Sequence, residues 1–371
     1  DAYWNTTKDL LMKTAIPGIT GFTSTYANVG QTSNKGIEIA LQGVLVKTRD
    51  WNVTAGFNIN FNRGKVDKLA DNVTGLYGTE WATSSTFPKS DYVLKEGRPV
   101  GLVRGLTADG FYTTDDFTYE NGVYTLKEGV ADVSSAVFPN YHLHNGMNER
   151  PAGQLAYPGM AKFKDLNDDG IINDDDVDVI GDMTPVHTGG FNINATYKNF
   201  DLGLYFNWSY GNEIYNVNKL AALYGYKEGA VYENKLSIVK DCYKIYDVVN
   251  GELVALTTPE QLNAANANAK LPLAYSENGY VSTLGIEDGS YLRLNTLTLG
   301  YTLPKSMLQK AGISNLRVYG SIYNVFTITG YSGIDAEVST STSTKTYPQL
   351  GMDWGTYPRA RSFVLGVNLS F

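Results

Sequence analysis

The amino-acid sequence predicts an all-β protein, an antiparallel β-barrel that crosses a membrane with its strands. Three observations lead to this prediction. Apolar and polar residues alternate with a period of two, aromatic residues lie near the ends of the alternating segments, and short connections alternate with very long ones. A period of two places successive side chains on opposite faces of a strand, whereas a helix repeats every 3.6 residues.

The alternation is clearest in the last segment, 362–371. Its apolar parity comprises Phe363, Leu365, Val367, Leu369 and Phe371, and the other parity is polar apart from Val364. Similar patterns predict further strands at 37–46, 51–62, 191–197, 202–210, 291–303 and 316–328. The parity changes near Asn295 and Thr296, which predicts a β-bulge. The first strand is expected within 1–12.

The alternating segments fit a membrane better than a soluble core. A ten-residue strand tilted by about 45° spans roughly 24 Å, close to the roughly 25 Å apolar band of an outer-membrane barrel. The apolar parity of the four cleanest segments carries no charge, and the polar parity is rich in Asn, Gly and Tyr, as in a water-filled lumen. A soluble β-sandwich also alternates. However, the aromatic residues near strand ends predict interfacial girdles; they are Trp51, Tyr197, Trp208, Tyr210 and Tyr301.

Connection lengths give the orientation. Short turns at 48–50, 198–200 and 304–315 fall on one side of the predicted sheet. Long segments fall on the other side, at 12–36, 64–188, 211–290 and 329–361. Short periplasmic turns and long extracellular loops are typical of outer-membrane barrels. About eight strands could close a small barrel, but such long loops favour one part of a larger barrel. The longest loop could hide another strand pair, such as 99–104 and 110–114.

Composition excludes several classes of protein. The net charge of −8 argues against a nucleic-acid partner. The single cysteine, Cys242, excludes an intrachain disulfide framework. No apolar window is long enough for a transmembrane helix. The segment 1–10 does not have the pattern of a secretory signal, so we expect a mature or truncated chain.

Several stretches resemble the SusC/RagA-like TonB-dependent transporters of the Bacteroidetes outer membrane. They are 28–41 (NVGQTSNKGIEIAL), 163–170 (FKDLNDDG) with 179–181 and Pro185, 291–301 (YLRLNTLTLGY) with Pro304, 317–326 (RVYGSIYNVF) and 357–371. Each stretch alone is weakly specific, but their order is specific. The resemblance covers the whole chain, 1–371.

The resemblance implies the C-terminal portion of a barrel of about 22 strands. A plug domain, a TonB box and the first strands are not recognisable here, so an N-terminal remainder of the same transporter is an expected partner. The resemblance further implies a SusD-like surface lipoprotein over the extracellular loops, outer-membrane lipids around the wall, and TonB-driven uptake of oligosaccharides or peptides. The second hypothesis is a self-contained eight-stranded adhesin or anchor.

One acidic stretch predicts a metal site with a structural role in the loop 64–188. In 165–176 (DLNDDGIINDDD), oxygen ligands at positions 1, 3, 5, 7 and 12 suit calcium, with magnesium a weaker fit. The predicted ligands are the side chains of Asp165, Asn167, Asp169 and Asp176 and the carbonyl of Ile171. Position 12 is Asp rather than the Glu of an EF-hand, as in dockerin loops with Asn173 at position 9. The alternative is a solvated acidic turn.

No catalytic motif is present, and we predict that the protein is not an enzyme. His142 and His144 could form a metal pair but fit ordinary loop polarity better, and adjacent carboxylates at Asp115 and Asp116 do not define a glycosidase. Aromatic residues in the long loops could stack on a substrate, although packing is the commoner role. They are Tyr77, Trp81, Phe87, Phe111, Tyr112, Tyr141, Tyr224, Tyr226 and Trp354.

Overall fold

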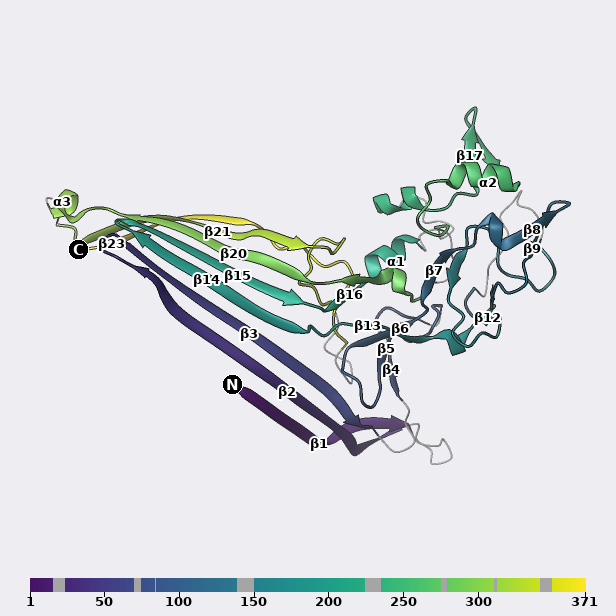
Figure 1. Cartoon of the computed structure of the whole chain (residues 1–371), viewed down its shortest axis with the longest axis horizontal. Helices are drawn as coiled ribbons and strands as arrows, with labels where there is room; N and C mark the ends of the chain where they lie inside the picture. Colours follow the sequence, from purple (N-terminus) through teal and green to yellow (C-terminus); the bar gives the residue numbers. More distant parts are fainter. Residues whose placement is uncertain are drawn as a thin grey trace.

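The computed structural model describes residues 1–15, 24–69, 75–83, 85–138, 150–223, 235–274, 279–309, 312–340 and 349–371, without the side chains of 12–15, 24, 27 and 29. Its main element is an eight-stranded sheet in which every neighbouring pair is antiparallel (Figure 1). The strands, in spatial order, are β1 (Ala2–Ala15), β2 (Ser24–Lys47), β3 (Trp51–Lys68), β14 (His187–Tyr197), β15 (Phe200–Tyr210), β20 (Tyr291–Thr302), β21 (Asn315–Thr329) and β23 (Ser362–Ser370).

The sheet is open. Its order starts at β1 and ends at β23, and these two edge strands are not paired with each other among the described residues. A self-contained eight-stranded barrel would require that pairing, because a barrel closes when its first and last strands share a hydrogen-bond ladder. The arrangement is therefore that of one segment of a larger barrel wall.

The predicted strand faces are confirmed by the register. Leu41, Phe57, Phe191 and Phe206 follow one another across four adjacent strands, and Leu294 continues the row on β20. This apolar row is not a dry core, since Phe57 is 40% exposed, Leu365 on the same face of β23 is 89% exposed, and Leu204 and Phe206 are only half-buried. An apolar face without a protein partner is what lipid contact requires.

The opposite face is polar and internally hydrogen-bonded. Asn194 donates from Nδ2 to Oδ1 of Asn192 over 3.1 Å, and the Tyr205 hydroxyl donates to Asn194 Oδ1 over 3.1 Å. Nearer the short-turn end, Arg317 on β21 donates from Nε to Asp201 Oδ1 over 2.8 Å. These contacts fit the predicted water-filled lumen, where polar side chains meet water and one another.

Two aromatic girdles delimit the apolar band. At the short-turn end, Trp51 lies against Tyr197 with ring centroids 4.5 Å apart, and Phe200 lies against Tyr301 at 4.7 Å. At the other end, His187 stacks on Tyr210 at 5.0 Å. Along β3, Trp51 and Phe61 are ten residues apart, which corresponds to roughly 24 Å across a membrane for a strand tilted by about 45°.

The bulge predicted near Asn295 and Thr296 is confirmed. β15 pairs Tyr205 with Thr296 and Phe206 with Leu294, so Asn295 is the extra residue on β20. β21 compensates with its own irregularity at Asn324, whose φ of +53° lies in the left-handed region. An extra residue reverses which parity faces outward, and this explains the change of pattern along β20.

Two strand boundaries were predicted wrongly. The segment 12–36 was expected to be a loop, but β1 continues to Ala15 and β2 begins at Ser24, so most of that segment is paired. β3 likewise continues to Lys68 beyond the expected end at Asn62. The cause is that backbone pairing does not depend on apolar alternation: polar residues rich in Thr, Ser and Asn extend the ladder beyond the apolar band.

The long segments, which were predicted to be extracellular, fold into a cap at the end of the sheet opposite the C-terminus (Figure 1). Its small sheets contain β4 (Leu76–Gly78), β5 (Tyr92–Leu94), β6 (Leu102–Gly105) and β13 (Asp178–Asp182); β7 (Ala108–Phe111) with β11 (Ala161–Phe163); β8 (Phe117–Glu120) with β9 (Val123–Leu126); β10 (Asp132–Val133) with β12 (Ile171–Ile172); β16 (Glu213–Asn216), β19 (Ile286–Asp288) and β22 (Met352–Asp353); and β17 (Tyr246–Val249) with β18 (Glu252–Ala255).

The strand pair predicted inside the longest loop is not a barrel hairpin. β6 and β7 do fall near 99–104 and 110–114, but β6 pairs with β5 and β13, and β7 pairs with β11. β6 therefore pairs with a strand just upstream and with one far along the chain, and β7, among the described residues, pairs only with a distant one.

Helices are short. The α-helices are α1 (Val217–Leu223), α2 (Pro259–Asn266) and α3 (Lys305–Leu308), and the 3₁₀ turns are η2 (Thr114–Asp116), η3 (Asp174–Asp176), η4 (Ser237–Asp241) and η5 (Thr283–Gly285). Helix α3 lies in the connection between β20 and β21, on the same side as the C-terminus (Figure 1). Among the described residues, no helix is both long enough and apolar enough to cross a membrane.

A charge on the apolar face should destabilise the barrel. We expect Phe57→Arg in the complete protein to cost about 2–4 kcal/mol of folding free energy, because Phe57 lies near the middle of the apolar band. Asn58→Arg is the matched control, since Asn58 faces the lumen. Urea unfolding in lipid vesicles, followed by electrophoretic mobility of unheated samples, measures the difference. Equal effects of the two substitutions would contradict the assignment of faces.

Candidate functional site

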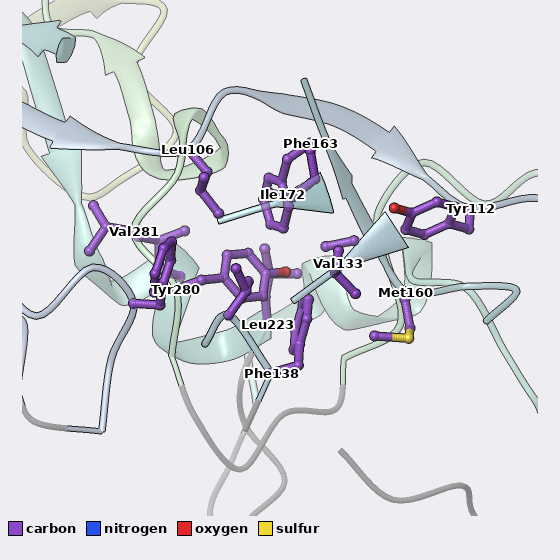
Figure 2. Packing of buried hydrophobic residues seen from close by; sticks show 14 of the residues in the cluster. Leu106, Tyr112, Val133, Phe138, Met160, Phe163, Ile172, Leu223, Tyr280 and Val281 are labelled. Carbon is purple, nitrogen blue, oxygen red and sulfur yellow. The ribbon is translucent and has the colours of Figure 1, made fainter. Parts of the chain in front are cut away.

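The candidate functional site is the extracellular cap, which is a folded unit with its own hydrophobic core. The cap consists of three insertions: the first lies between β3 and β14, the second between β15 and β20, and the last between β21 and β23. In the core, residues of the first insertion pack near residues of the second (Figure 2). Those of the first are Leu106, Tyr112, Val133, Phe138, Met160, Phe163 and Ile172, and those of the second are Leu223, Tyr280 and Val281. All ten are at most 5% exposed. The two insertions therefore stabilise each other, since neither core half is covered without the other.

The cap is anchored where β15 leaves the barrel. After Gly211 and Asn212, β16 pairs antiparallel with β19 and parallel with β22, so the second insertion and the last one share a small sheet. The first insertion joins through Glu213, whose Oε2 accepts a hydrogen bond from the Asp182 backbone N–H over 2.7 Å. Burial raises the pKa of Glu213, although this bond opposes the shift.

A second carboxylate, Glu287 on β19, holds the last insertion against the second. Its Oε1 accepts from the Lys219 ammonium over 3.1 Å, and Oε2 accepts from the Ser332 backbone N–H over 2.9 Å. Burial alone would raise the pKa of Glu287, but the hydrogen bonds from Ser332 and the charge of Lys219 outweigh it and lower the pKa. Glu287 is thus held ionised as a fixed acceptor.

An ionic cluster ties the last insertion to the barrel wall. Arg293 on β20 is 1% exposed; its guanidinium binds Asp335, donates to Glu337 over 3.0 Å and donates from Nε to Thr327 Oγ1 over 2.9 Å. Arg359 completes the cluster with a 2.8 Å contact to Glu337. Buried charges persist only when they are paired and hydrogen-bonded in this way.

Sequence reasoning did not single out this cluster. The available signal was Arg293 itself, a cation inside an otherwise uncharged strand, which has to find a counter-charge if it is buried. The identity of the counter-charge could not be read, because Asp335 and Glu337 lie 42 and 44 residues away in a loop.

The predicted metal-ligating residues lie close together but are engaged with backbone groups. Asp165 accepts from the Gly170 N–H over 2.7 Å, and Asp169 accepts from the Ile171 N–H over 2.9 Å. Asn167 lies between them, with its Nδ2 3.0 Å from Asp169 Oδ2. Gly170 has φ +84°, which suits the predicted tight turn.

Asp176, the predicted ligand at position 12, is fully buried and closes the loop. Its two oxygens accept from the backbone N–H groups of Leu166 and Asn173, each over 2.8 Å. Within the described residues, no three Asp, Glu, His or Cys side chains are grouped as a metal site. A pocket of about 630 Å³ beside the loop is lined by three carboxylates, Asp109, Asp165 and Asp168, and by two lysines, Lys162 and Lys164. Calcium binding stays a prediction.

The other candidates mostly have packing roles. Phe87 and Tyr112 are buried, Phe111 packs against Tyr243, and Trp81 against Tyr215. Tyr77 and Trp354 are about half exposed. Tyr141, His142, His144, Tyr224 and Tyr226 lie outside the described residues.

The remaining titratable candidates are also structural. His187 accepts at Nδ1 from the Trp208 indole N–H over 3.0 Å, within the aromatic girdle at the end of the sheet opposite the short turns. Asp116 binds the Lys162 ammonium over 2.7 Å. Burial acts to raise the pKa of Asp116, but the bonds from Lys162 and Thr113 lower it overall. Both groups are used to hold the fold.

An antiparallel sheet with an exposed apolar band, two aromatic girdles, a polar inner face and a folded extracellular cap defines a segment of an outer-membrane β-barrel. Over its whole length the chain is 30% identical to TonB-dependent receptor P3 of Formosa agariphila (376 residues, 32% of that protein). It is 26% identical to TonB-dependent receptor SusC of Bacteroides thetaiotaomicron (379 residues, 30% of that protein). No family model matches.

Solved structures agree on the fold. The chain matches the RagAB peptide importer in its closed-closed state with a TM-score of 0.67 and 23% identity, over 100% of this chain and 33% of that one. The chain spans about a third of the length of the relatives it matches. Over that third the chain is similar in sequence to TonB-dependent receptors, and in fold to the RagAB structure. These relatives are receptors and transporters, not enzymes, in agreement with the sequence prediction.

Within the ionic cluster, the buried Arg293 should contribute more to stability than the partly exposed Arg359. We expect Arg293→Met to destabilise the last insertion by about 3–5 kcal/mol, because it leaves the buried Asp335 with only the longer 3.9 Å contact to the partly exposed Arg359. Arg359→Met is the control; Arg359 is 46% exposed on its side chain, and its loss should cost at most about 1 kcal/mol. Hydrogen–deuterium exchange of 330–340 in the complete protein reports local opening. Equal exchange in both variants would show that burial does not set the strength of the cluster.

Calcium should stabilise the acidic loop. At one hundred times Kd, we expect a gain of about 2.7 kcal/mol in the complete protein, removed by the double substitution Asp165→Asn and Asp169→Asn. Asp168→Asn is the matched control, because position 4 supplies no predicted ligand. Thermal unfolding with calcium, with magnesium and with a chelator provides the measurement. A calcium response that survives in the double variant would exclude this loop as the site.

Proposed function

We propose that the complete protein imports oligosaccharides or peptides across the outer membrane, with energy supplied through TonB. The observation that carries the proposal is the coupling of an open barrel wall to a large folded cap within one chain that is homologous, end to end, to TonB-dependent receptors. This segment would supply barrel wall, lumen surface and cap, and the remaining strands and a plug would come from the rest of the protein.

We further propose that a SusD-like lipoprotein covers the cap. Support comes from the relatives: SusC is one of them, and the fold matches the RagAB assembly, which is described as a peptide importer. The cap would provide a suitable platform, because β16, β19 and β22 join the second insertion to the last, and Glu213 on β16 joins the first insertion to them. The choice between glycan and peptide as substrate is left to experiment.

The import function is tested in the source organism. Deletion of the gene should abolish growth on the oligosaccharide or peptide that is imported, and restoration of the complete gene should recover it. Deletion of tonB should have the same effect, whereas growth on a small sugar that diffuses through porins should be unchanged. Retained uptake without TonB would contradict energised import. Co-purification of a lipoprotein with the tagged barrel tests the proposed partner.

A further inference from the structure

The first insertion contains a cavity of about 430 Å³. Segments 85–90 and 135–137 line it, together with Arg104 and Asp174. The lining includes the hydroxyl side chains of Ser85, Thr86, Ser90 and Ser135 and the apolar side chains of Phe87 and Ala136. The cavity therefore offers both hydrogen-bonding groups and apolar surface, the combination typical of small-ligand sites.

Arg104 is held rigidly at this cavity. It lies on β6, and its guanidinium carbon is 4.7 Å from the centroid of the Tyr77 ring. Its Nη1 donates a hydrogen bond to Ser90 Oγ over 2.8 Å. Within the described part of the chain, Ser90 is its one side-chain hydrogen-bond acceptor. A guanidinium has five N–H donors, so the Arg104 side chain retains N–H groups that can donate to a ligand.

The charge at the cavity favours an anion. Arg104 and Lys89 outnumber the single carboxylate, Asp174, in the lining of a chain whose net charge is −8. Asp174 is exposed, and among the described residues it acts on Arg104 through its charge without a direct ion pair. Burial lowers the pKa of Arg104, although Tyr77 and Asp174 partly oppose the shift. The guanidinium is thus a partly desolvated cation without a close counter-charge.

We propose that this cavity binds a carboxylate group of the imported molecule, with the carbon skeleton beside it against Phe87 and Ala136. A planar carboxylate matches the guanidinium fork, and Lys89 and the hydroxyls of the lining supply further donors. The assignment to an imported molecule rests on the proposed function. Peptide C-termini and acidic sugars share this chemistry.

Direct binding to the purified complete protein tests the site. The probe is benzoate, which combines a carboxylate with an apolar ring, and benzamide is its uncharged counterpart. By ligand-observed NMR we expect benzoate to bind at least about tenfold more tightly than benzamide, the difference that one charge-assisted contact provides. Arg104→Met should remove this preference and Arg104→Lys should retain part of it. The exposed Arg98→Met, outside the cavity lining, should leave binding unchanged.

Competition with benzoate identifies the source of the carboxylate. One comparison uses a tripeptide and its C-terminal amide, and the other uses a uronic-acid disaccharide and its carboxyl-reduced form. We expect one of the two acids to displace benzoate and its neutral form to leave benzoate bound. Equal binding of benzoate and benzamide, or binding unchanged in Arg104→Met with an unaltered unfolding temperature, would overturn the proposal. Failure of both acids to compete would overturn its substrate assignment. TonB-dependent growth is scored separately, so import can stand when this site fails.

Discussion

Continuous pairing of the backbone is the constraint on which this structure depends. In hydrocarbon an unpaired N–H or C=O costs several kcal/mol, so a wall that faces lipid has to complete its ladder from strand to strand. The seven strand pairs from β1 to β23 do this, and their registers align the outward side chains into apolar rows. Among the described residues β1 and β23 form the two edges of the sheet, and the same constraint applies to their outer backbone groups.

The cap obeys a different rule. Outside the membrane, long connections can hydrogen-bond to water, but they order only if they bury enough apolar surface to offset their conformational entropy. The first two insertions do so jointly, with Tyr280 and Val281 of one packed near Phe163 and Leu106 of the other (Figure 2). Polar contacts then join the insertions to one another through Glu213 and Glu287, and Arg293 on β20 joins the last insertion to the wall.

The wall and the cap also explain why residue types have opposite meanings in the two regions. Leu365 is exposed on the wall, where its surroundings are lipid. Leu106 is buried in the cap, because an exposed leucine there would face water. Arg293 is buried where the two regions meet, and Asp335 compensates its charge. A strand residue cannot be classed as core or surface until the solvent on each side is known.

The sequence alone determined the barrel wall. Alternation with a period of two, the girdle residue Trp51 and the bulge at Asn295 are local properties, because each depends on which side of one strand a residue occupies. In 24–36 the backbone is paired although apolar and polar residues do not alternate, so the sequence pattern did not predict this part of β2 and its start was placed too late. The tertiary structure decided the cap core, the Arg293 cluster and the Arg104 cavity. Their members are tens to more than a hundred residues apart, and short-range periodicity holds no information about such contacts.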